Sequence, residues 1–304
     1  MFHLLYNSDM SKGTYLLHPE LIESIPIGSN LLGRNLGLRV EETLVDNLDA
    51  DPNISLVIRA LNEAEKLEQL FADIHRQLFQ SEVEVIVVDN DSTDRTPQVA
   101  KYYGAEVVNL PRGSFTYPKS MNLGFIAASH DVVLTTVGHA NLSNIYSFHA
   151  GARHFNDGDV GGAYAGVLHN EGASTIERYA SIAVGLELMK PAHRIKRARI
   201  GVLAATSAMI SKAAWEELGR FDERYETGGE DTALAAKMLA NCYDVLREPA
   251  MTVHHSHGLG VIDSIKQLRG WQQTLKAPRK LDKDKLFARR PDLLANFDKD
   301  TFKA

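Results

Sequence analysis

The sequence predicts an α/β fold with a mainly parallel central sheet and helices on both faces. Two short runs rich in Val and Ile, residues 54–59 and 83–88, are typical of strands buried on both faces. Each run ends in a polar loop, and each loop leads into a segment with apolar residues at helical spacing. Strands that alternate with helices in this way form a parallel sheet with helices packed on both sides.

The alternation continues in order through the first half of the chain. The apolar positions after the first run recur every three or four residues, which favours a helix, and Ser92 and Asp94 are good N-caps for the helix that follows the second run. Gly104 suits the end of that helix. We expect strands over 54–59, 83–88, 106–110 and 132–137, and helices over 63–78, 96–103 and 119–128.

The second half has weaker periodicity. We expect helices over 143–155, 176–189, 212–218, 232–239 and 261–275, and strands over 160–167, 204–210 and 243–247. Residues 53–275 then form one domain. Residues 1–52 are an N-terminal extension that we expect to pack on this domain or on a second copy of the chain, and residues 276–304 are a highly charged tail.

Composition excludes several classes of protein. The chain has 304 residues and a formal net charge of −6, which argues against a general nucleic-acid binder. Cys242 is the only cysteine, so an intrachain disulfide and a thiolate zinc cluster are both excluded. No run of residues reaches the length of a membrane-spanning helix. We therefore expect a cytoplasmic protein, and peripheral membrane contact is compatible with that expectation.

Polar residues follow the first two predicted strands. Asp89 ends the second strand, and Asn62 and Glu63 follow the first. Because parallel strands of such a sheet form a ligand crevice at their carboxyl ends, Asp89 is placed to accept hydrogen bonds from a nucleobase or a ribose. The alternative is that Asp89, Asp91 and Ser92 only cap the next helix, as such residues often do.

A lysine stands at the expected start of a later helix. Pro118 suits the first turn of a helix, and Lys119 follows it, so this N-terminus is a candidate phosphate site. The alternative is a solvent-exposed lysine.

Two histidine positions are candidate ligands for a metal or a phosphate. His139 follows the fourth predicted strand, and residues 253–258 carry His254, His255 and His257. In an extended chain, His255 and His257 point to one side and His254 to the other. The alternative for each is a hydrogen-bonded structural histidine.

Two adjacent acids follow a glycine pair at residues 228–229. Glu230 and Asp231 open a predicted helix, where they either complement the helix dipole or direct a general base into a pocket beside the glycine turn.

Taken in order, these motifs resemble the family 2 glycosyltransferases, which adopt the GT-A fold. The resemblance covers about residues 53–275 and rests on short motifs in a characteristic order. They are Asn-Glu after the first strand, Val-Val-Asp-Asn-x-Ser-Thr-Asp, Asn-Leu-Gly, Phe-Asp-Glu, Gly-Glu-Asp and His-x-His.

The resemblance implies roles for individual residues. Asp89 matches the aspartate that contacts the nucleobase. Glu63, which follows Asn62, matches the loop that contacts the base and the ribose, and Asp231 matches the catalytic base of inverting members. Lys119 and Asn122 match the helix beneath the diphosphate, and His255 matches a histidine that helps hold the metal or diphosphate. We also expect Arg59, Asp91 and Glu230 in the donor site, and His139 and His257 beside His255 as metal ligands.

One departure bears on metal use. The family usually places Asp-x-Asp, which holds Mg²⁺ or Mn²⁺, where this chain has Val137-Gly-His139. Mg²⁺ prefers oxygen ligands, whereas Mn²⁺ accepts imidazole more readily. Arg59 and Gly138-His-Ala140 resemble a subset of bacterial rhamnosyltransferases.

The resemblance implies an inverting hexosyl- or deoxyhexosyltransferase that uses a nucleotide-sugar donor and a glycan or lipid-linked acceptor. The alternative is a catalytically inactive nucleotide-sugar-binding protein of the same fold. A nucleotidyltransferase is a weaker alternative, because residues 59–63 lack the glycine-rich loop of that class. A dinucleotide dehydrogenase is weaker still, because no Gly-x-Gly-x-x-Gly motif follows a strand.

Overall fold

The structure is a computed structural model, and it describes residues 14–15, 51–156, 158–170, 173, 178, 190–199 and 201–256. The predicted helices over 176–189 and 261–275, the charged tail and His257 lie outside the described residues, apart from Arg178. No helix in the described ranges combines the length and the apolar character that a membrane crossing needs.

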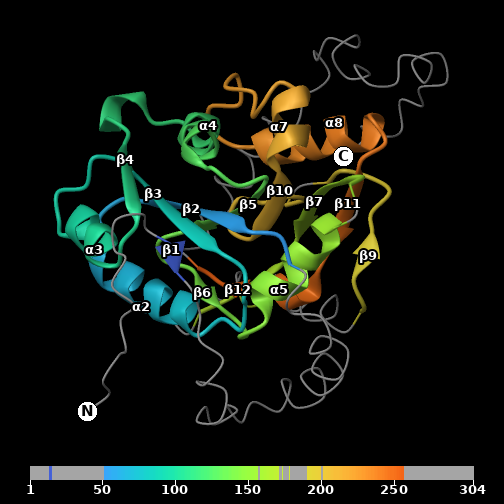
Figure 1. Ribbon diagram of the computed structural model, residues 1–304. Coiled ribbons are helices and arrows are strands. Elements are labelled where there is room, and N and C mark those ends of the chain that lie inside the picture. The colour runs from blue at the N-terminus through green and yellow to red at the C-terminus, as the bar shows by residue number, and fades with distance from the viewer. Residues whose placement is uncertain are drawn as a thin grey trace.

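A large central sheet organises the molecule (Figure 1). Its strands are β1 (Thr14–Tyr15), β2 (Ile54–Ala60), β3 (Val83–Asp89), β4 (Glu106–Asn109), β5 (Val132–Val137), β7 (Val160–Tyr164), β9 (His193–Arg194), β10 (Ala208–Ser211) and β11 (Asp244–Arg247). Along the sheet the order is β1-β3-β2-β5-β10-β7-β11-β9, and β4 pairs with β3 on the same edge as β1.

The sheet is parallel where the sequence predicts it, across β4, β3, β2 and β5. Strand β10 departs from this pattern because it runs antiparallel to both of its neighbours, β5 and β7. Strand β11 is again parallel to β7. The central strands are buried along almost their whole length, as the runs of Val and Ile predict.

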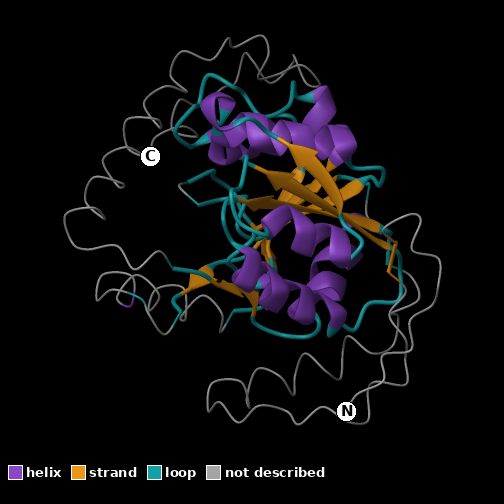
Figure 2. Ribbon diagram, turned by 90° about the vertical axis from the view of Figure 1, so that its left-hand side faces the viewer, coloured by secondary structure: helices purple, strands orange, loops and turns teal. Residues whose placement is uncertain are grey.

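Helices cover both faces of the sheet (Figure 2). The helices are α2 (Ala64–His75), α3 (Thr96–Tyr102), α4 (Tyr117–Ala127), α5 (Ser147–Ala152), α7 (Lys212–Glu217) and α8 (Glu230–Ala240), with 3₁₀ turns at Arg112–Ser114, Arg153–Asn156 and Pro249–Met251. One hydrophobic core joins α2, α3 and α5 to the sheet, and a second joins α4, α7 and α8 to its other face (Figure 1). The α/β fold with helices on both faces is confirmed.

Local signals explain where the helices begin. The Thr116 side chain accepts a hydrogen bond from Lys119 N, and Pro118 occupies the first turn of α4. Asp94 accepts from the backbone of Thr96 at the start of α3. Gly104, with φ 77°, follows that helix in the left-handed conformation that favours glycine.

A second, three-stranded sheet lies beside the main one, in the order β6 (Asn141–Leu142), β12 (Val253–His254) and β8 (Val167–Leu168). The predicted single strand over 160–167 is therefore wrong in extent. It divides into β7 and β8, which pair in different sheets. The predicted strand over 204–210 is also too long, because turns occupy most of residues 201–207 before β10.

Candidate active site

Three parallel strands end side by side. Their register pairs Ala60 of β2 with Asp89 of β3, and Arg59 of β2 with Val137 of β5. Backbone hydrogen bonds continue past the strands, from Asn90 N to Ala60 O and from Gly138 N to Arg59 O, both at 2.9 Å. The segments that follow all three strands therefore begin at one edge of the sheet, as the sequence predicts.

The loops after β2 and β3 are tied to each other. Asn62 N donates to Ser92 Oγ at 2.9 Å, and Thr93 N donates to Asn62 Oδ1 at 2.7 Å. Asn62 and Asp91 have φ values of 54° and 58°, a left-handed conformation that Asn and Asp tolerate better than other non-glycine residues. The structure thus engages the Asn62 side chain in joining the loops, while Asp91 is exposed beside them.

Asp89 is buried at the end of β3, and one of its two carboxylate oxygens has no hydrogen bond within the described structure. Oδ2 accepts from Ser92 N at 3.1 Å, whereas Oδ1 has no partner. A buried polar atom without a partner is uncommon in folded proteins and calls for an explanation, such as a ligand. The capping bond therefore uses one oxygen of this side chain and leaves the other available for a ligand.

The histidine at the end of β5 meets the histidine after β12. His139 Nε2 lies 2.8 Å from His255 Nε2, and the two rings stack with centroids 4.6 Å apart. On its other side, His139 Nδ1 is bonded to Glu63 Oε1. The three side chains therefore form a hydrogen-bonded row across the strand ends, and His254 instead bonds the carbonyl of His169 at 3.1 Å.

The acid pair opens α8 beside a partly buried arginine. Gly228 and Gly229 have φ values of 118° and 101°, which glycine alone adopts readily, and they turn the chain directly into Glu230 and Asp231. The charges of both acids and of Glu63 act on the Arg59 guanidinium at the end of β2. The acid pair and the strand ends therefore share one electrostatic environment.

Burial changes the ionisation of these groups. It raises the pKa of Glu230 to about 8, an effect that the adjacent Asp231 strengthens and Arg59 opposes. Burial also raises the pKa of Asp231, although a hydrogen bond from Thr232 N and the charge of Arg59 counteract it. Burial lowers the pKa of Arg59, against the opposing charge of Glu230. Two adjacent carboxylates in such a site titrate together rather than independently.

Helix α4 contributes three residues with different roles. Tyr117 was not among the residues singled out from the sequence, yet its half-exposed ring lies 5.1 Å from the Arg59 guanidinium. Lys119 is partly buried in the first turn of the helix. Asn122 is buried and bonds both backbone groups of Phe221, so its amide holds the loop that leads to α8. The one sequence feature that could have pointed to Tyr117 is its position directly before Pro118, in the first turn of the predicted helix.

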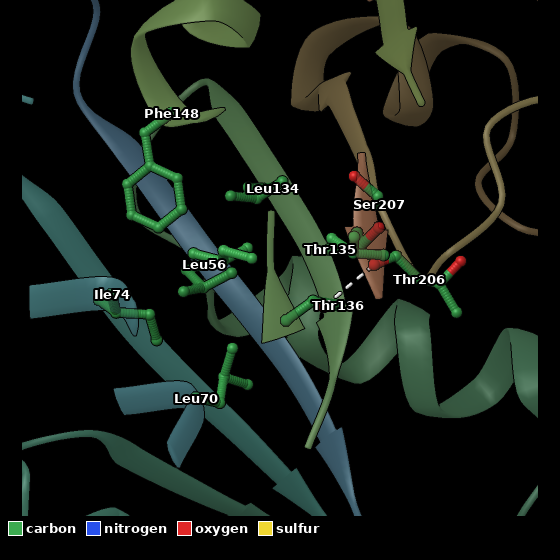
Figure 3. A pocket seen from close by; sticks show the side chains of 11 residues that line it. Leu56, Leu70, Ile74, Leu134, Thr135, Thr136, Phe148, Thr206 and Ser207 are labelled. Carbon is green, nitrogen blue, oxygen red and sulfur yellow. Dashed lines mark hydrogen bonds between the residues drawn. The ribbon is translucent and has the colours of Figure 1, made fainter. Parts of the chain in front are cut away.

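The structure thus brings Arg59, Glu63, Asp89, His139, His255, Glu230 and Asp231 to one edge of the sheet. Across the described residues, no group of three or more His, Cys, Asp or Glu side chains could hold a metal ion. A cavity in the core, between strands β2 and β5 and helices α2 and α5, is lined by residues such as Leu56, Phe148 and Thr136 and measures about 10 Å³ (Figure 3). It has room for roughly one water molecule and is part of the core, not a donor site.

A family model described as Glycosyl transferase family 2 matches residues 55–219, more than half of the chain. The chain belongs to glycosyltransferase family 2. The matched segment contains every strand end described above, whereas Glu230, Asp231 and His255 lie beyond it. The family that the sequence motifs indicated is therefore confirmed.

Two curated relatives have partial similarity. The O-antigen chain rhamnosyltransferase WbaN of Salmonella anatum is 24% identical over 212 residues, which cover 68% of this chain and 67% of that protein. The 4,4'-diaponeurosporenoate glycosyltransferase of Staphylococcus haemolyticus is 41% identical over only 58 residues, 19% of this chain and 15% of that protein. The matched part of this chain therefore covers far less than two thirds of the length of the Staphylococcus haemolyticus protein.

Solved glycosyltransferase structures share the fold. Glucosyl-3-phosphoglycerate synthase of Mycobacterium tuberculosis, in complex with Mn²⁺, UDP and glucosyl-3-phosphoglycerate, aligns with a TM-score of 0.55 and 16% identity over 84% of this chain and 86% of that one. The mannosyltransferase PcManGT of Pyrobaculum calidifontis, in complex with GDP-Man and Mn²⁺, aligns with a TM-score of 0.51 and 14% identity over 89% and 85%. The architecture is the GT-A fold.

Proposed function

We propose that this glycosyltransferase moves a sugar from a nucleoside diphosphate sugar to an acceptor hydroxyl, with inversion at the anomeric carbon. The observation that carries the proposal is a concentration of buried polar atoms without partners at the strand ends. Within the described residues they include Arg59 Nε, Asp89 Oδ1 and Glu230 Oε2. Such atoms cost free energy in the unliganded protein, so a polar ligand that pairs with them is strongly favoured.

The donor would lie across the ends of β2, β3 and β5. Asp89 Oδ1 is free to accept a hydrogen bond from the N–H edge of a base or from a ribose hydroxyl. Lys119, in the first turn of α4, adds a positive charge to a helix N-terminus, which favours phosphate. Both features fit a nucleoside diphosphate of any base, and the donor panel described below identifies the base.

Asp231 is the general base in this proposal. A single displacement needs a group that takes the proton of the acceptor hydroxyl as its oxygen attacks the anomeric carbon. The raised pKa of Asp231 makes the carboxylate a better base than an exposed aspartate. Arg59 lies close enough for its charge to keep an ionised acid stable in this buried setting.

The family's usual metal ion can be accommodated only in part by this chain's own side chains. His139 Nε2 and His255 Nε2 face each other and fit two positions around one divalent ion, such as Mn²⁺, whose other ligands would be diphosphate oxygens. A bound ion would neutralise the charge that develops on the departing diphosphate. His257 is proposed as a further ligand on its sequence pattern alone.

We further propose a deoxyhexose or hexose as the sugar and a glycan or lipid-linked molecule as the acceptor, with the reaction in the cytoplasm. The partial similarity to a rhamnosyltransferase of O-antigen chains supports this class of reaction, as do Arg59 and the Gly-His-Ala motif at residues 138–140. Contact with the surface of a membrane and self-association through residues 1–52 are parts of the same proposal.

Incubation of the purified protein with a panel of UDP-, GDP-, dTDP- and CMP-sugars, followed by measurement of released nucleotide, tests the function. We expect release from one class of donor, enhanced by the right acceptor. The missing Asp-x-Asp motivates the alternative, a binding protein without catalysis. Tight nucleotide binding without release, in the presence of a broad acceptor mixture, would favour that alternative and overturn the catalytic proposal.

A further inference from the structure

Glu63 points to a histidine rather than to an open nucleoside site. Its Oε1 is bonded to His139 Nδ1, and its side chain and that of His139 are about equally buried, with 16% and 15% of their surfaces exposed. The main chain of Glu63 is fixed as well, because its N–H donates to Thr96 Oγ1 at 2.8 Å. Glu63 is thus held both at its backbone and at its carboxylate.

A side chain on the residue between Val137 and His139 would displace the Glu63 carboxylate from this position. A Cβ added at Gly138 would lie 2.3 Å from Glu63 Oε2 and 3.4 Å from its Cδ. Gly138 is not among the residues with positive φ, so its backbone does not itself require glycine. The missing side chain therefore serves to admit the Glu63 carboxylate, which is an observation independent of the hydrogen bond.

The carboxylate determines which nitrogen of His139 carries a proton. A carboxylate accepts but does not donate, so His139 Nδ1–H donates to Glu63 and the Nε2 of the neutral ring is an acceptor. In this tautomer His255 Nε2–H donates to His139 Nε2 at 2.8 Å, and a divalent ion held by both rings would take the place of that proton. A carboxylate behind a histidine is the arrangement that orients metal-binding imidazoles in proteins and raises their basicity.

We propose that Glu63 is a positioning residue that fixes the tautomer and rotamer of His139, so that His139 and His255 together accept a divalent ion brought by the donor diphosphate. This inference rests on the proposed function and assigns Glu63 a role other than ribose contact. It also predicts ion preference. Two imidazole ligands favour Co²⁺ over Mn²⁺ and disfavour Mg²⁺, which prefers oxygen.

Calorimetric titration of the full chain with UDP, GDP and dTDP, in EDTA and in Mg²⁺, Mn²⁺ or Co²⁺, tests the proposal without measuring turnover. For the wild type we expect the gain in nucleotide affinity to rise in the order Mg²⁺, Mn²⁺, Co²⁺. Glu63→Ala should reduce the gain in Mn²⁺ and Co²⁺ by about 10–100-fold, the usual loss when such a supporting carboxylate is removed. Its affinity in EDTA should not change, because Glu63 does not touch the nucleotide.

Three further variants make the test specific. Gly138→Ala keeps the carboxylate but displaces it, and should lose the metal-dependent gain in the same way. Glu63→Gln keeps an oxygen acceptor and should show an intermediate loss. Glu65→Ala removes an exposed acid two residues further along and should match the wild type in every buffer. The visible absorption spectrum of bound Co²⁺ should change in Glu63→Ala and Gly138→Ala but not in Glu65→Ala.

Different results overturn different claims. If Glu63→Ala lowers affinity equally in EDTA and in Mn²⁺, Glu63 contacts the nucleotide and the positioning role is wrong. The role is also wrong if wild-type affinity is unaffected by any ion, or if Glu63→Ala behaves as the wild type. If the wild type binds none of the three nucleotides under any condition, the proposed function fails and this inference fails with it.

Discussion

Asp231 and Glu230 are adjacent acids in one buried site, and only one of them is needed as the base. The proposed base is Asp231, so Asp231→Asn should leave nucleotide affinity nearly intact and reduce sugar transfer by about 10²–10⁴-fold, the usual contribution of a general base. Initial rates and calorimetry on the same preparation measure both quantities. Glu226→Gln, an exposed acid of the preceding loop, is the control. Transfer within a few-fold of the wild type would reject Asp231 as the base.

Glu230 gives a prediction about stability and pH. Its pKa rises from the ordinary value of 4.5 to about 8 on folding, mainly through burial. The folded state therefore holds this proton more tightly than the unfolded state, and the free energy of unfolding falls as pH rises from about 4.5 to about 8. Because Glu230 and Asp231 titrate together, this fall belongs to the acid pair, with burial of Glu230 as its main cause.

The variant Glu230→Gln carries no such penalty because glutamine does not ionise. We expect its melting temperature to lie close to that of the wild type at pH 5 and clearly above it at pH 8. Thermal melts at half-unit pH intervals measure the gap, with Glu226→Gln as the control for loss of an exposed charge. A gap of constant size across this range would show that Glu230 is ionised throughout in the folded protein.

Among the elements, α4 is hydrogen-bonded to the loop before α8 through the side chain of Asn122. Asn122 Nδ2 donates to Phe221 O at 2.9 Å, and Asn122 Oδ1 accepts from Phe221 N at 3.1 Å. The sequence resemblance placed Asn122 beneath the diphosphate, whereas the structure engages its amide with this loop. The loop leads through Gly228 and Gly229 to the acid pair, so Asn122 supports the site from a distance.

We therefore expect Asn122→Ala to affect stability more than ligand binding. It leaves the buried peptide groups of Phe221 without partners, which should cost about 1–3 kcal/mol of unfolding free energy. Urea denaturation measures that loss, and calorimetry should show nucleoside diphosphate affinity within about threefold of the wild type. Asn109→Ala, at an exposed position on β4, should change neither quantity. A large loss of affinity with unchanged stability would instead favour direct diphosphate contact.

The central elements could be predicted because their signal is local. β2, β3 and β5 differ from the predicted strands by no more than one residue, since strands buried on both faces are continuous runs of apolar residues. β8 and β12 have two residues each, which is too short for a periodic pattern, so the sequence could not predict the sheet that they form. The antiparallel direction of β10 depends on long-range packing, and no local pattern encodes it.

The same distinction applies to the candidate site. Asp89 and His139 could be proposed because each directly follows a recognisable strand. The contact of Glu63 with His139 joins residues 76 positions apart, and that of Asn122 with Phe221 joins residues 99 positions apart. Those pairings follow from the register of the sheet and the packing of α4 and α8, so only a folded structure reveals them.

At the scale of the whole molecule, the candidate site depends on both halves of the chain. Asp89 belongs to β3 in the first half, whereas Asp231 and His255 come from α8 and the segment after β12 in the second. The central sheet that joins them has a hydrophobic core on each face. A ligand that contacts both halves binds only when the sheet and both cores are intact, so its binding energy stabilises the whole folded domain.

A thermal-shift screen of UDP, GDP, dTDP and CMP, with and without Mn²⁺, should therefore show one nucleotide class that raises the melting temperature. At a free concentration of 100 times Kd the stabilisation is about 2.7 kcal/mol, enough for a shift of several degrees. Asp89→Asn is the informative variant. An Asn side-chain oxygen can still accept from Ser92 N, as Asp89 Oδ2 does at 3.1 Å, so the unliganded melt should change little. Its amide group removes the charged acceptor that Asp89 Oδ1 offers a ligand, so the nucleotide-dependent shift should largely disappear. A shift that survives in Asp89→Asn would place the nucleotide elsewhere on the molecule, and no shift with any nucleotide would contradict a donor site at the strand ends.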